Sequence, residues 1–473
     1  MTGFGCRLYN NAEALLQDIT DFTYFLRTDP EAQAFLSDCR ADAPVTLARA
    51  PGRLDVMGGV ADYSGSLVAE MSIAEAALVA LAPRTDRTLR VWSRGIEAEE
   101  LTPQVSLSLN DFYADGLLAD YKTVHSHLRR APETRWAAYL FGCVYVLLAE
   151  GIVPSFPYGA NLILDSRVPL GAGVSSSAAI EVAAMQAINA AYGLRLNGIL
   201  VARLSQMVEN KVVGAPCGIM DQMTSALCVQ SSLLLILCQP HEVQGTQALP
   251  GGVRVFGINS AVKHSVGGSA YTRARVAAFM GRKILMIDHG QKAEYLTQME
   301  DYYNVNQPEL PEVMPGSDFL QRYGETGDPV THVDPEVFYP VKASTRHAMR
   351  EDLMVWSFAG VLKSSTPIKT ALMYAGKNMY ASHASYTRIG LGCEESDLLV
   401  GLGREAGPAK GIYGAKITGG GSGGTVAFLT YGERAEQTIH EIAEAYRQQT
   451  GLTPQIFEGG LSPGAMAFGS ETL

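Results

Sequence analysis

Apolar and polar positions along the chain follow the periods of both helices and strands. Residues 9–40 have helical spacing of apolar positions, interrupted at Pro30, and predict one or two leading helices. Residues 45–50 and 65–81 are rich in apolar and small side chains and predict two strands around a glycine-containing turn. Residues 89–93 alternate between apolar and polar side chains and predict a further strand.

The middle of the chain adds helices to these strands. Residues 134–150 place apolar side chains on one face and end before Gly151, as a helix does. Residues 178–192 are dominated by Ala, Ile, Val and Met, which predicts a buried helix capped by the serines before it. Residues 200–213 predict another helix. Strands are predicted at 161–168, 231–238 and 253–259, and a strand, a glycine loop and a second strand at 412–429.

Two stretches interrupt this patterning. Residues 300–345 are rich in Pro, Asp, Glu and Gly and predict an irregular, partly exposed segment. Proline and glycine also gather at 240–252, where the composition changes. Because 473 residues are too many for one ordinary core, we expect two domains, at 1–245 and 246–473.

Composition and charge narrow the class of protein. Hydrophobic residues make up 47% and charged residues 18% of the chain, which is typical of a globular enzyme. The net charge of -11 argues against nucleic acid or an acidic membrane as a partner. It does not exclude an anionic ligand, because backbone N–H groups can bind phosphate.

Cysteine usage and the beginning of the chain predict a cytoplasmic protein. The seven cysteines include no CxxC pair and no zinc spacing, which fits a reducing compartment. No signal peptide and no run of about 18 apolar residues is present, so we expect no membrane span.

The first candidate for chemistry is the glycine- and serine-rich stretch 169–179 before the buried helix. Its glycines allow close backbone approach to a ligand, and its serines fall at the helix N-terminus, where N–H groups and the helix dipole favour phosphate. A plain N-cap on a flexible loop is the alternative, and a Walker-type loop is excluded because no lysine is present. The candidate residues are Gly171, Ala172, Gly173, Val174, Ser175, Ser176 and Ser177.

The second candidate is a pair of carboxylates. Asp221 follows Glu209 by twelve positions, after a turn that contains Gly214, Pro216 and Gly218. One carboxylate for a metal and one for a substrate hydroxyl is the pairing that phosphoryl transfer uses. Taken alone, the segment favours the structural alternative, a capping aspartate and a solvated glutamate.

The third candidate is the glycine loop at 416–424. Five of the six residues 419–424 are glycine, which suggests close approach of the backbone to another group. A strand follows the loop, whereas a dinucleotide fingerprint requires a helix there, so a Rossmann site is disfavoured. A simple hairpin loop remains an alternative.

Together with two further segments, these motifs resemble the GHMP small-molecule kinases, and within them the galactokinase-like enzymes. Residues 50–65 (APGRLDVMGGVADYSG) resemble the galactokinase sugar signature, and residues 259–271 resemble another galactokinase segment. The similarity extends from about residue 45 to residue 430, and the arabinokinase branch matches best. The resemblance implies an α+β, two-domain fold with the active site in the interdomain cleft. It also implies an ATP- and Mg²⁺-dependent kinase for the anomeric hydroxyl of a monosaccharide.

The resemblance also assigns roles in phosphoryl transfer. Asp221 would accept or orient the proton of the sugar 1-hydroxyl, and Arg53 beside it would stabilise charge on the transferring phosphoryl group. The loop 171–177 would wrap the phosphates of ATP, with Ser177 and Glu209 holding magnesium. Such positioning and charge neutralisation is what phosphoryl transfer requires.

Further roles concern the sugar. Asp62 would accept hydrogen bonds from ring hydroxyls, and Tyr271 and the backbone near Gly218 would add sugar contacts. The third motif, at Gly419, Gly420 and Gly421, would support the catalytic region. The implied partners are a monosaccharide and ATP, with no nucleic acid, membrane or partner protein.

One departure from the family pattern bears on the substrate. Galactokinases carry a Glu-His pair near the C6 hydroxymethyl of the sugar, where this chain has Gly59 and Val60, and Asp55 replaces an Asn. A buried 6-hydroxyl left unpaired costs about 1–3 kcal/mol. L-Arabinose lacks that carbon, so the sequence predicts L-arabinose as the substrate and β-L-arabinose 1-phosphate as the product.

Two alternatives stay open. One is a galactokinase or galacturonokinase with a rearranged C6 pocket, in which Lys263 or His264 could meet a uronate carboxylate. The other is a non-catalytic sugar sensor, which the intact residues 175–179, Arg53, Glu209 and Asp221 disfavour.

Overall fold

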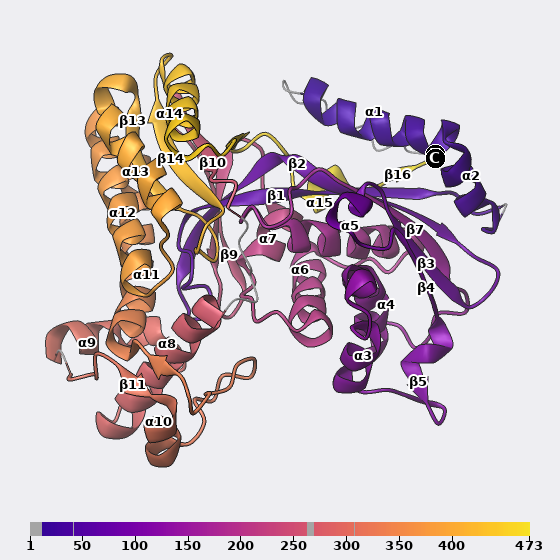
Figure 1. Ribbon diagram of the computed structural model, residues 1–473, viewed down its shortest axis with the longest axis horizontal. Coiled ribbons are helices and arrows are strands. Elements are labelled where there is room, and N and C mark those ends of the chain that lie inside the picture. Colours follow the sequence, from indigo (N-terminus) through magenta and orange to yellow (C-terminus); the bar gives the residue numbers. More distant parts are fainter. Residues whose placement is uncertain (1–11, 41, 263–268, 307) are drawn as a thin grey trace.

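Two β-sheets with their helices form the molecule, and a third helical layer extends from one end (Figure 1). The computed structural model describes residues 12–40, 42–262, 269–306 and 308–473. In Figure 1 the first sheet lies to the right, with α1 above it and α3, α4 and α6 below it. The second sheet lies at the upper left, and α8, α9 and α10 lie at the lower left.

The first sheet has eight strands in the order β16-β1-β2-β7-β3-β4, with β8 paired to β2 and β9 paired to β8. The pair β3–β7 is parallel and the other pairs are antiparallel. The strands are β1 (Thr46–Met57), β2 (Leu67–Pro83), β3 (Thr88–Ser93), β4 (Gln104–Ser108), β7 (Ala160–Ser166), β8 (Ser232–Leu237), β9 (Glu242–Ala248) and β16 (Glu471–Thr472).

Both faces of this sheet are covered. α1 (Ala12–Thr28) and α2 (Pro30–Ser37) bury Phe22 and Phe35 against Trp92 and Ile163 on one face. The predicted interruption at Pro30 is confirmed, because α1 ends before it and Pro30 begins α2, in whose first turn proline is well tolerated. The opposite face is covered by α3 (Tyr121–Leu128), α4 (Ala138–Ala149), α5 (Ser176–Ala191), α6 (Gly198–Met207), α7 (Met220–Leu227) and α15 (Ala465–Phe468).

The Ala-rich sequence of α5 explains its central position. Twelve of its sixteen residues are buried, and its small side chains let it lie directly on β1 and β2. The predicted buried helix is thus confirmed. The helix predicted at 200–213 is α6 followed by a π-helical turn, η4 (Val208–Val213). Short turns and strands complete this part of the chain: η1 (Ile96–Glu99), η2 (Leu109–Phe112), β5 (Tyr113–Ala114), β6 (Leu117–Leu118) and η3 (Pro132–Ala137).

The second sheet is antiparallel, in the order β13-β14-β10-β15. Its strands are β10 (Val253–Asn259), β13 (Ile412–Ile417), β14 (Thr425–Tyr431) and β15 (Gln455–Glu458). One face packs on α12 (Ile368–Arg388), α13 (Glu394–Ala406) and α14 (Ala435–Thr450), with a 3-10 turn at η6 (Pro408–Lys410). The predicted strand, glycine loop and strand at 412–429 are confirmed as β13 and β14.

The third layer consists of α8 (Ser269–Asp288), η5 (Leu296–Met299), α9 (Glu300–Asn306), α10 (Gly316–Tyr323) and α11 (Val341–Lys363), with the pair β11 (Met314–Pro315) and β12 (Phe338–Tyr339). The prediction of an irregular segment at 300–345 is therefore wrong in part. Phe319 and Tyr323, one helical turn apart, stack in the core of this layer and stabilise α10 despite the proline-rich surroundings.

The α+β class is confirmed by this mixture of sheets and helices. The division at residue 245 stays a prediction, and that residue lies inside β9. Among the described residues, every helix falls short of the length or the apolar character that crossing a membrane requires.

A buried ion pair joins the two sheets. Lys416 in β13 donates from Nζ to Asp55 Oδ2 in β1 at 2.7 Å, and both side chains are fully buried. The backbone N–H groups of Asp55 and Gly419 add bonds across the same junction, to Thr418 Oγ1 at 2.7 Å and to Asp55 Oδ2 at 3.2 Å. The pair therefore fixes the position of the third motif relative to the sugar signature.

Replacing one partner tests how strongly this junction is held. Lys416→Met leaves a buried carboxylate without its cation, so the free energy of unfolding should fall by about 3–5 kcal/mol. Adding Asp55→Asn removes that charge and should restore part of the loss. The control is Lys410→Met, which breaks an exposed pair with Glu441 and should cost no more than about 1 kcal/mol. Equal losses for Lys416→Met and the control in urea unfolding would contradict this interpretation.

Candidate active site

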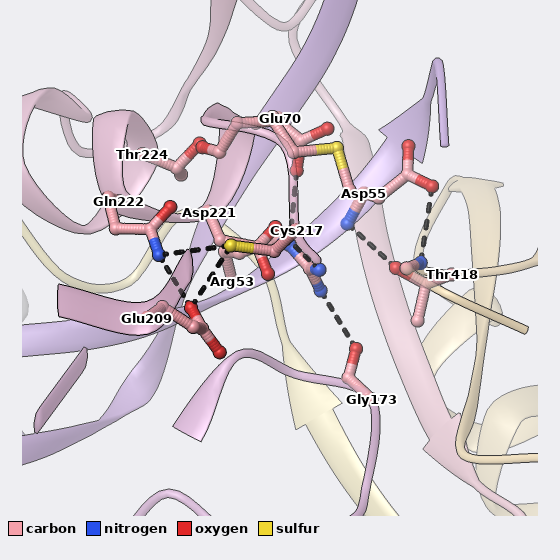
Figure 2. A network of polar contacts seen from close by, with 12 residues as sticks. Arg53, Asp55, Glu70, Gly173, Glu209, Cys217, Asp221, Gln222, Thr224 and Thr418 are labelled. Carbon is pink, nitrogen blue, oxygen red and sulfur yellow. Dashed lines mark hydrogen bonds and ion pairs between the residues drawn. The ribbon is translucent and has the colours of Figure 1, made fainter. Parts of the chain in front are cut away.

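Arg53 connects three of the predicted motifs (Figure 2). Its guanidinium donates from Nε and Nη2 to Asp221 Oδ1, at 2.8 and 2.7 Å, and from Nη1 to the carbonyl oxygen of Gly173 at 2.8 Å. The carboxylate of Glu70 lies 3.5 Å from Nε. The structure thus brings the sugar signature, the glycine–serine loop and the carboxylate segment to one point.

The local backbone explains why Arg53 points here. Strand β1 has a register shift between Pro51 and Arg53, and irregularities of this kind redirect side chains next to active sites. The guanidinium is 3% exposed. Burial lowers its pKa, but the nearby carboxylates, Asp221 first among them, outweigh this effect and raise the pKa. Arg53 therefore stays a cation in the site.

Asp221 lies in the first turn of α7 and is the accessible member of this group. Its side chain is 20% exposed, whereas those of Arg53 and Glu70 are almost fully buried. One carboxylate oxygen, Oδ1, takes both bonds from Arg53. This leaves the other oxygen, Oδ2, for a ligand.

The loop 171–177 has the conformation of an anion cradle rather than of a capped helix. Gly171, Gly173 and Ser175 all have positive φ angles, of 73°, 73° and 61°. Ser175 is the N-cap residue of α5, but its side chain makes no capping bond, so the predicted serine cap is wrong. The hydroxyls of Ser175 and Ser176 are buried without a partner among the described residues. These hydroxyls and the N–H groups of the first turn are left for a ligand.

The third motif supports this cradle from the second sheet. Thr425 Oγ1 donates to the carbonyl oxygen of Ala172 at 2.8 Å. Gly419, with a φ of 63°, lies so close to the site that an added Cβ would be 3.0 Å from Arg53 Nη2 and 3.1 Å from the Gly173 oxygen. Gly420 and Gly421 continue the turn. The glycine loop therefore contacts the same guanidinium that binds Asp221.

Glu209 lies on the other side of the cradle, in the π-helical turn η4. Its carboxylate accepts hydrogen bonds from Gln222 Nε2 at 2.7 Å, from Cys217 Sγ at 3.4 Å and from the hydroxyl of Ser177 (Figure 2 draws the first two). Burial raises the pKa of Glu209 to about 7, with the charge of Asp221 adding to the effect. π-Helical turns are frequent at functional sites. Glu209 and Ser177 are thus brought together, as predicted.

A second buried carboxylate completes this group. Glu181, in the middle of α5, accepts from Gln222 Nε2 at 3.2 Å, and burial raises its pKa well above the ordinary value. Within the described residues, no group of three or more His, Cys, Asp or Glu side chains is arranged to hold a metal ion. The pair Glu209 and Ser177 would therefore supply part of a coordination sphere and leave the rest to other ligands.

Asp62 lies near Asp221, whose charge acts on it. It is 3% exposed, its Oδ1 has no partner among the described residues, and burial together with the charge of Asp221 raises its pKa to about 7. Gly218 lies directly against it, since an added Cβ would be 1.6 Å from Asp62 Oδ2. Tyr271 in α8 is buried, and Asp62 contributes to the rise of its pKa.

A cavity of about 560 Å³ opens beside these residues. Its wall includes Gly218, Tyr63 and Arg275. Arg275 donates from Nε and Nη2 to the carboxylate of Asp328, at 2.7 and 2.9 Å, and its guanidinium lies 5.2 Å from the ring centroid of Tyr63. The arginine nearest to Asp62 across the cavity wall is therefore already paired with a carboxylate.

The departure at residues 59–60 has a structural cause. An added Cβ at Gly59 would lie 1.8 Å from Tyr386 Oη and 2.1 Å from Asp55 Oδ2, so position 59 has no room for a side chain. Val60 has a φ of 57° and is buried in the core of the third layer. Neither position directs a polar side chain toward the cavity. Lys263 and His264, the residues considered for a uronate, lie outside the described residues.

Several residues of the site were not predicted from the sequence. They are Glu70, Glu181, Tyr386, Arg275 and Asp328. Glu70 and Glu181 did carry a signal, because each is a single carboxylate in an apolar strand or helix that must be buried. Arg275 and Asp328 carried no such signal in the sequence, since their pairing depends on how the third layer packs.

Comparisons with known proteins agree with this geometry. The family model of the GHMP kinases N terminal domain matches residues 138–228, and that of the GHMP kinases C terminal matches residues 368–448. The chain is 38% identical to the L-arabinokinase of Arabidopsis thaliana over 90% of this chain and 46% of that protein, so it spans about half the length of that relative. It is 31% identical to the galactokinase of Chloroflexus aggregans, over 87% of this chain and 90% of that protein.

The fold has a solved counterpart. The structure of Lactococcus lactis galactokinase complexed with galactose aligns with a TM-score of 0.72, 18% identity, and coverage of 97% of this chain and 100% of that one. Two matching family domains, a full-length relative above 30% identity and a shared fold point to the same group. The chain belongs to the galactokinase-like GHMP kinases, the sugar kinases of the galactokinase and arabinokinase type.

Proposed function

We propose that the chain transfers the γ-phosphoryl group of ATP to the anomeric hydroxyl of L-arabinose. The observation that carries this proposal is the position of Arg53, bonded at once to Asp221 and to the carbonyl of Gly173 in the phosphate cradle. Phosphoryl transfer needs an acceptor hydroxyl, a cation and a phosphate cradle within a few ångströms of one another. The chain supplies the cation and the cradle, together with a carboxylate that can receive the hydroxyl of the sugar.

Asp221 is the proposed acceptor of the proton from the 1-hydroxyl. Its Oδ2 is free of Arg53, and its side chain is partly exposed, so a substrate hydroxyl can reach it. Arg53 also lies at the edge of the cradle through Gly173, where negative charge on the transferring group would be stabilised.

The cradle fits the phosphates of ATP. The unpartnered hydroxyls of Ser175 and Ser176 and the N-terminus of α5 offer donors to phosphate oxygens. Glu209 and Ser177 would hold Mg²⁺, which usually binds to one or two carboxylates and to substrate phosphates, and which supplies charge neutralisation when bound.

The sugar would lie at Asp62, with Tyr271 and the backbone at Gly218 around it. The free Oδ1 of Asp62 is an acceptor for ring hydroxyls. Because Gly59 has no space for a side chain and Val60 is buried in the core, these positions provide no partner for a 6-hydroxyl. This supports a pentopyranose that lacks the sixth carbon.

The galactokinase-type relatives favour galactose as the second candidate. Galacturonate is disfavoured by one observation, because Arg275 is bound by both oxygens of Asp328 and is not free for a uronate carboxylate. The similarity to L-arabinokinase covers only part of that protein, so its name supports the proposal without deciding the sugar.

The substrate preference is the first prediction. In a panel of monosaccharides with ATP and magnesium, kcat/KM for L-arabinose should exceed that for D-galactose by about 5- to 150-fold, since an unpaired buried hydroxyl costs about 1–3 kcal/mol. A value for galactose equal to or above that for arabinose would overturn the choice of sugar. If none of the sugars in the panel leads to ATP consumption, the non-catalytic sensor is supported instead.

The second prediction concerns the proposed base. Asp221→Asn should lower kcat by about 100- to 10,000-fold, because the amide cannot accept the proton, while the affinity for ATP changes little. Asp301→Asn, at an exposed residue of α9, is the matched control and should keep wild-type turnover. Wild-type kcat in Asp221→Asn would refute the role of this carboxylate.

The third prediction uses the raised pKa of Asp62. Because its pKa is about 7 in the folded protein and lower in the unfolded chain, folding favours the protonated form. Its contribution to stability is therefore lost as the pH rises through 7. Asp62→Asn should raise the thermal midpoint relative to the wild type, and more at pH 8 than at pH 6, while increasing KM for the sugar.

The outcome separates a substrate-binding residue from a structural one. A structural aspartate would lower the midpoint when replaced and leave KM unchanged. Asp115→Asn, at an exposed turn residue, serves as the control here and should shift the midpoint equally at both pH values. A loss of stability in Asp62→Asn at pH 8 would contradict the assignment.

A further inference from the structure

A second cavity, of about 340 Å³, lies between α11 and the end of α12. It shares no lining residue with the first cavity or with the loop 171–177. Most of its lining is basic: Lys342, Arg346, His347, Arg350 and Arg388, with Ser385 beside them. Lys342, Arg346 and Arg350 are spaced by four residues on α11, so they lie along one face of that helix.

The acidic side chain that lines this cavity does not neutralise its arginines. The acidic residue in its wall, Glu312, already pairs with Lys342 at 2.5 Å. Arg346, Arg350 and Arg388 form no ion pair or hydrogen bond with a side chain among the described residues. This is unusual in a chain with a net charge of -11, in which carboxylates outnumber cations.

The guanidinium groups are close enough to repel one another. Burial, followed by the charges of Arg346 and Arg388, lowers the pKa of Arg350. Glu300, which lies outside the lining of the cavity, opposes this effect at Arg350. Like charges that share one cavity are an arrangement that a bound anion would relieve further. This repulsion agrees with the position of the three arginines in the wall of one cavity, and it is their shared cavity that defines the site.

The floor of the cavity is rigid and polar. His347 is 2% exposed, and its ring nitrogens contact Ser385 Oγ at 2.9 Å and the carbonyl oxygen of Gly59 at 3.1 Å. Burial lowers the pKa of His347 to about 4, so the ring is neutral. The proton must lie on Nε2, which faces a carbonyl, and Nδ1 accepts from the hydroxyl of Ser385. His347 thus connects this cavity to the backbone of the sugar signature.

We propose that this cavity binds the phosphoryl group of a small phosphorylated molecule, through the guanidinium groups of Arg346, Arg350 and Arg388. The planar donors of arginine match phosphate oxygens in pairs. A volume of about 340 Å³ suits a small molecule. The net charge of the chain disfavours nucleic acid as the occupant. The site is independent of the proposed kinase reaction and lies behind the sugar signature, on the opposite side of His347 from Gly59.

Calorimetric titration with inorganic phosphate, at low salt in a phosphate-free buffer, tests the proposal. The wild type should show a saturable site that is weakened at least about tenfold in Arg346→Ala/Arg388→Ala, since each charged hydrogen bond contributes about 1.5–3 kcal/mol and about 1.4 kcal/mol is tenfold. Lys369→Ala, at an exposed cation of α12 outside the cavity, is the matched control and should bind as the wild type does.

Two outcomes would overturn the proposal. One is the absence of saturable phosphate binding in the wild type. The other is the same affinity in the wild type and the double variant, which would place the phosphate elsewhere, for example in the loop 171–177. Because Arg346 and Arg388 are exposed, both variants should keep the thermal midpoint of the wild type. If the double variant does not fold, the single variant Arg388→Gln is titrated in its place and judged by the same two criteria.

Discussion

The contact of Arg53 with Asp221 and with the Gly173 carbonyl is the interaction on which the rest of the site depends. A buried guanidinium requires acceptors on several sides, and here each acceptor belongs to a different segment of the chain. The β1 irregularity at Pro51, the left-handed turn at Gly173 and the first turn of α7 all place groups around this one cation. The fold of the first sheet can thus be understood as the frame that brings these segments together.

The second sheet contributes through its glycine loop. Lys416 and Asp55 form a buried pair at the junction, and Gly419 lies against the guanidinium of Arg53. The same junction explains why position 59 is a glycine, because Tyr386 and Asp55 occupy the space that a side chain there would need. Asp55, paired with Lys416 of the third motif, therefore couples the sheet junction to the shape of the sugar signature at Gly59.

Much of this could be predicted from the sequence, because the signals were local. Most strands of both sheets, the buried helix α5 and the three motifs follow from apolar periodicity and from glycine and serine placement. The strands β4, β9, β15 and β16 were not predicted, and β9 lies within the stretch 240–252, where only a change of composition was noted. The helices within 300–345 were missed, since the burial of Phe319 and Tyr323 of α10 in the core of the third layer is a tertiary effect that the proline-rich composition does not signal. The pairing of Arg275 with Asp328 was also missed, because it depends on how separate segments of the third layer pack.

The central claim is that phosphate is transferred to the anomeric oxygen of the sugar, at the point where Asp221 and Arg53 meet the cradle. The most direct measurement is ³¹P and ¹³C NMR of the product formed from ATP and L-arabinose labelled with ¹³C at C1. We expect a phosphate monoester whose phosphorus couples to the labelled carbon, with ADP formed in equal amount. A phosphate on any other carbon, or inorganic phosphate with unchanged sugar, would contradict the account.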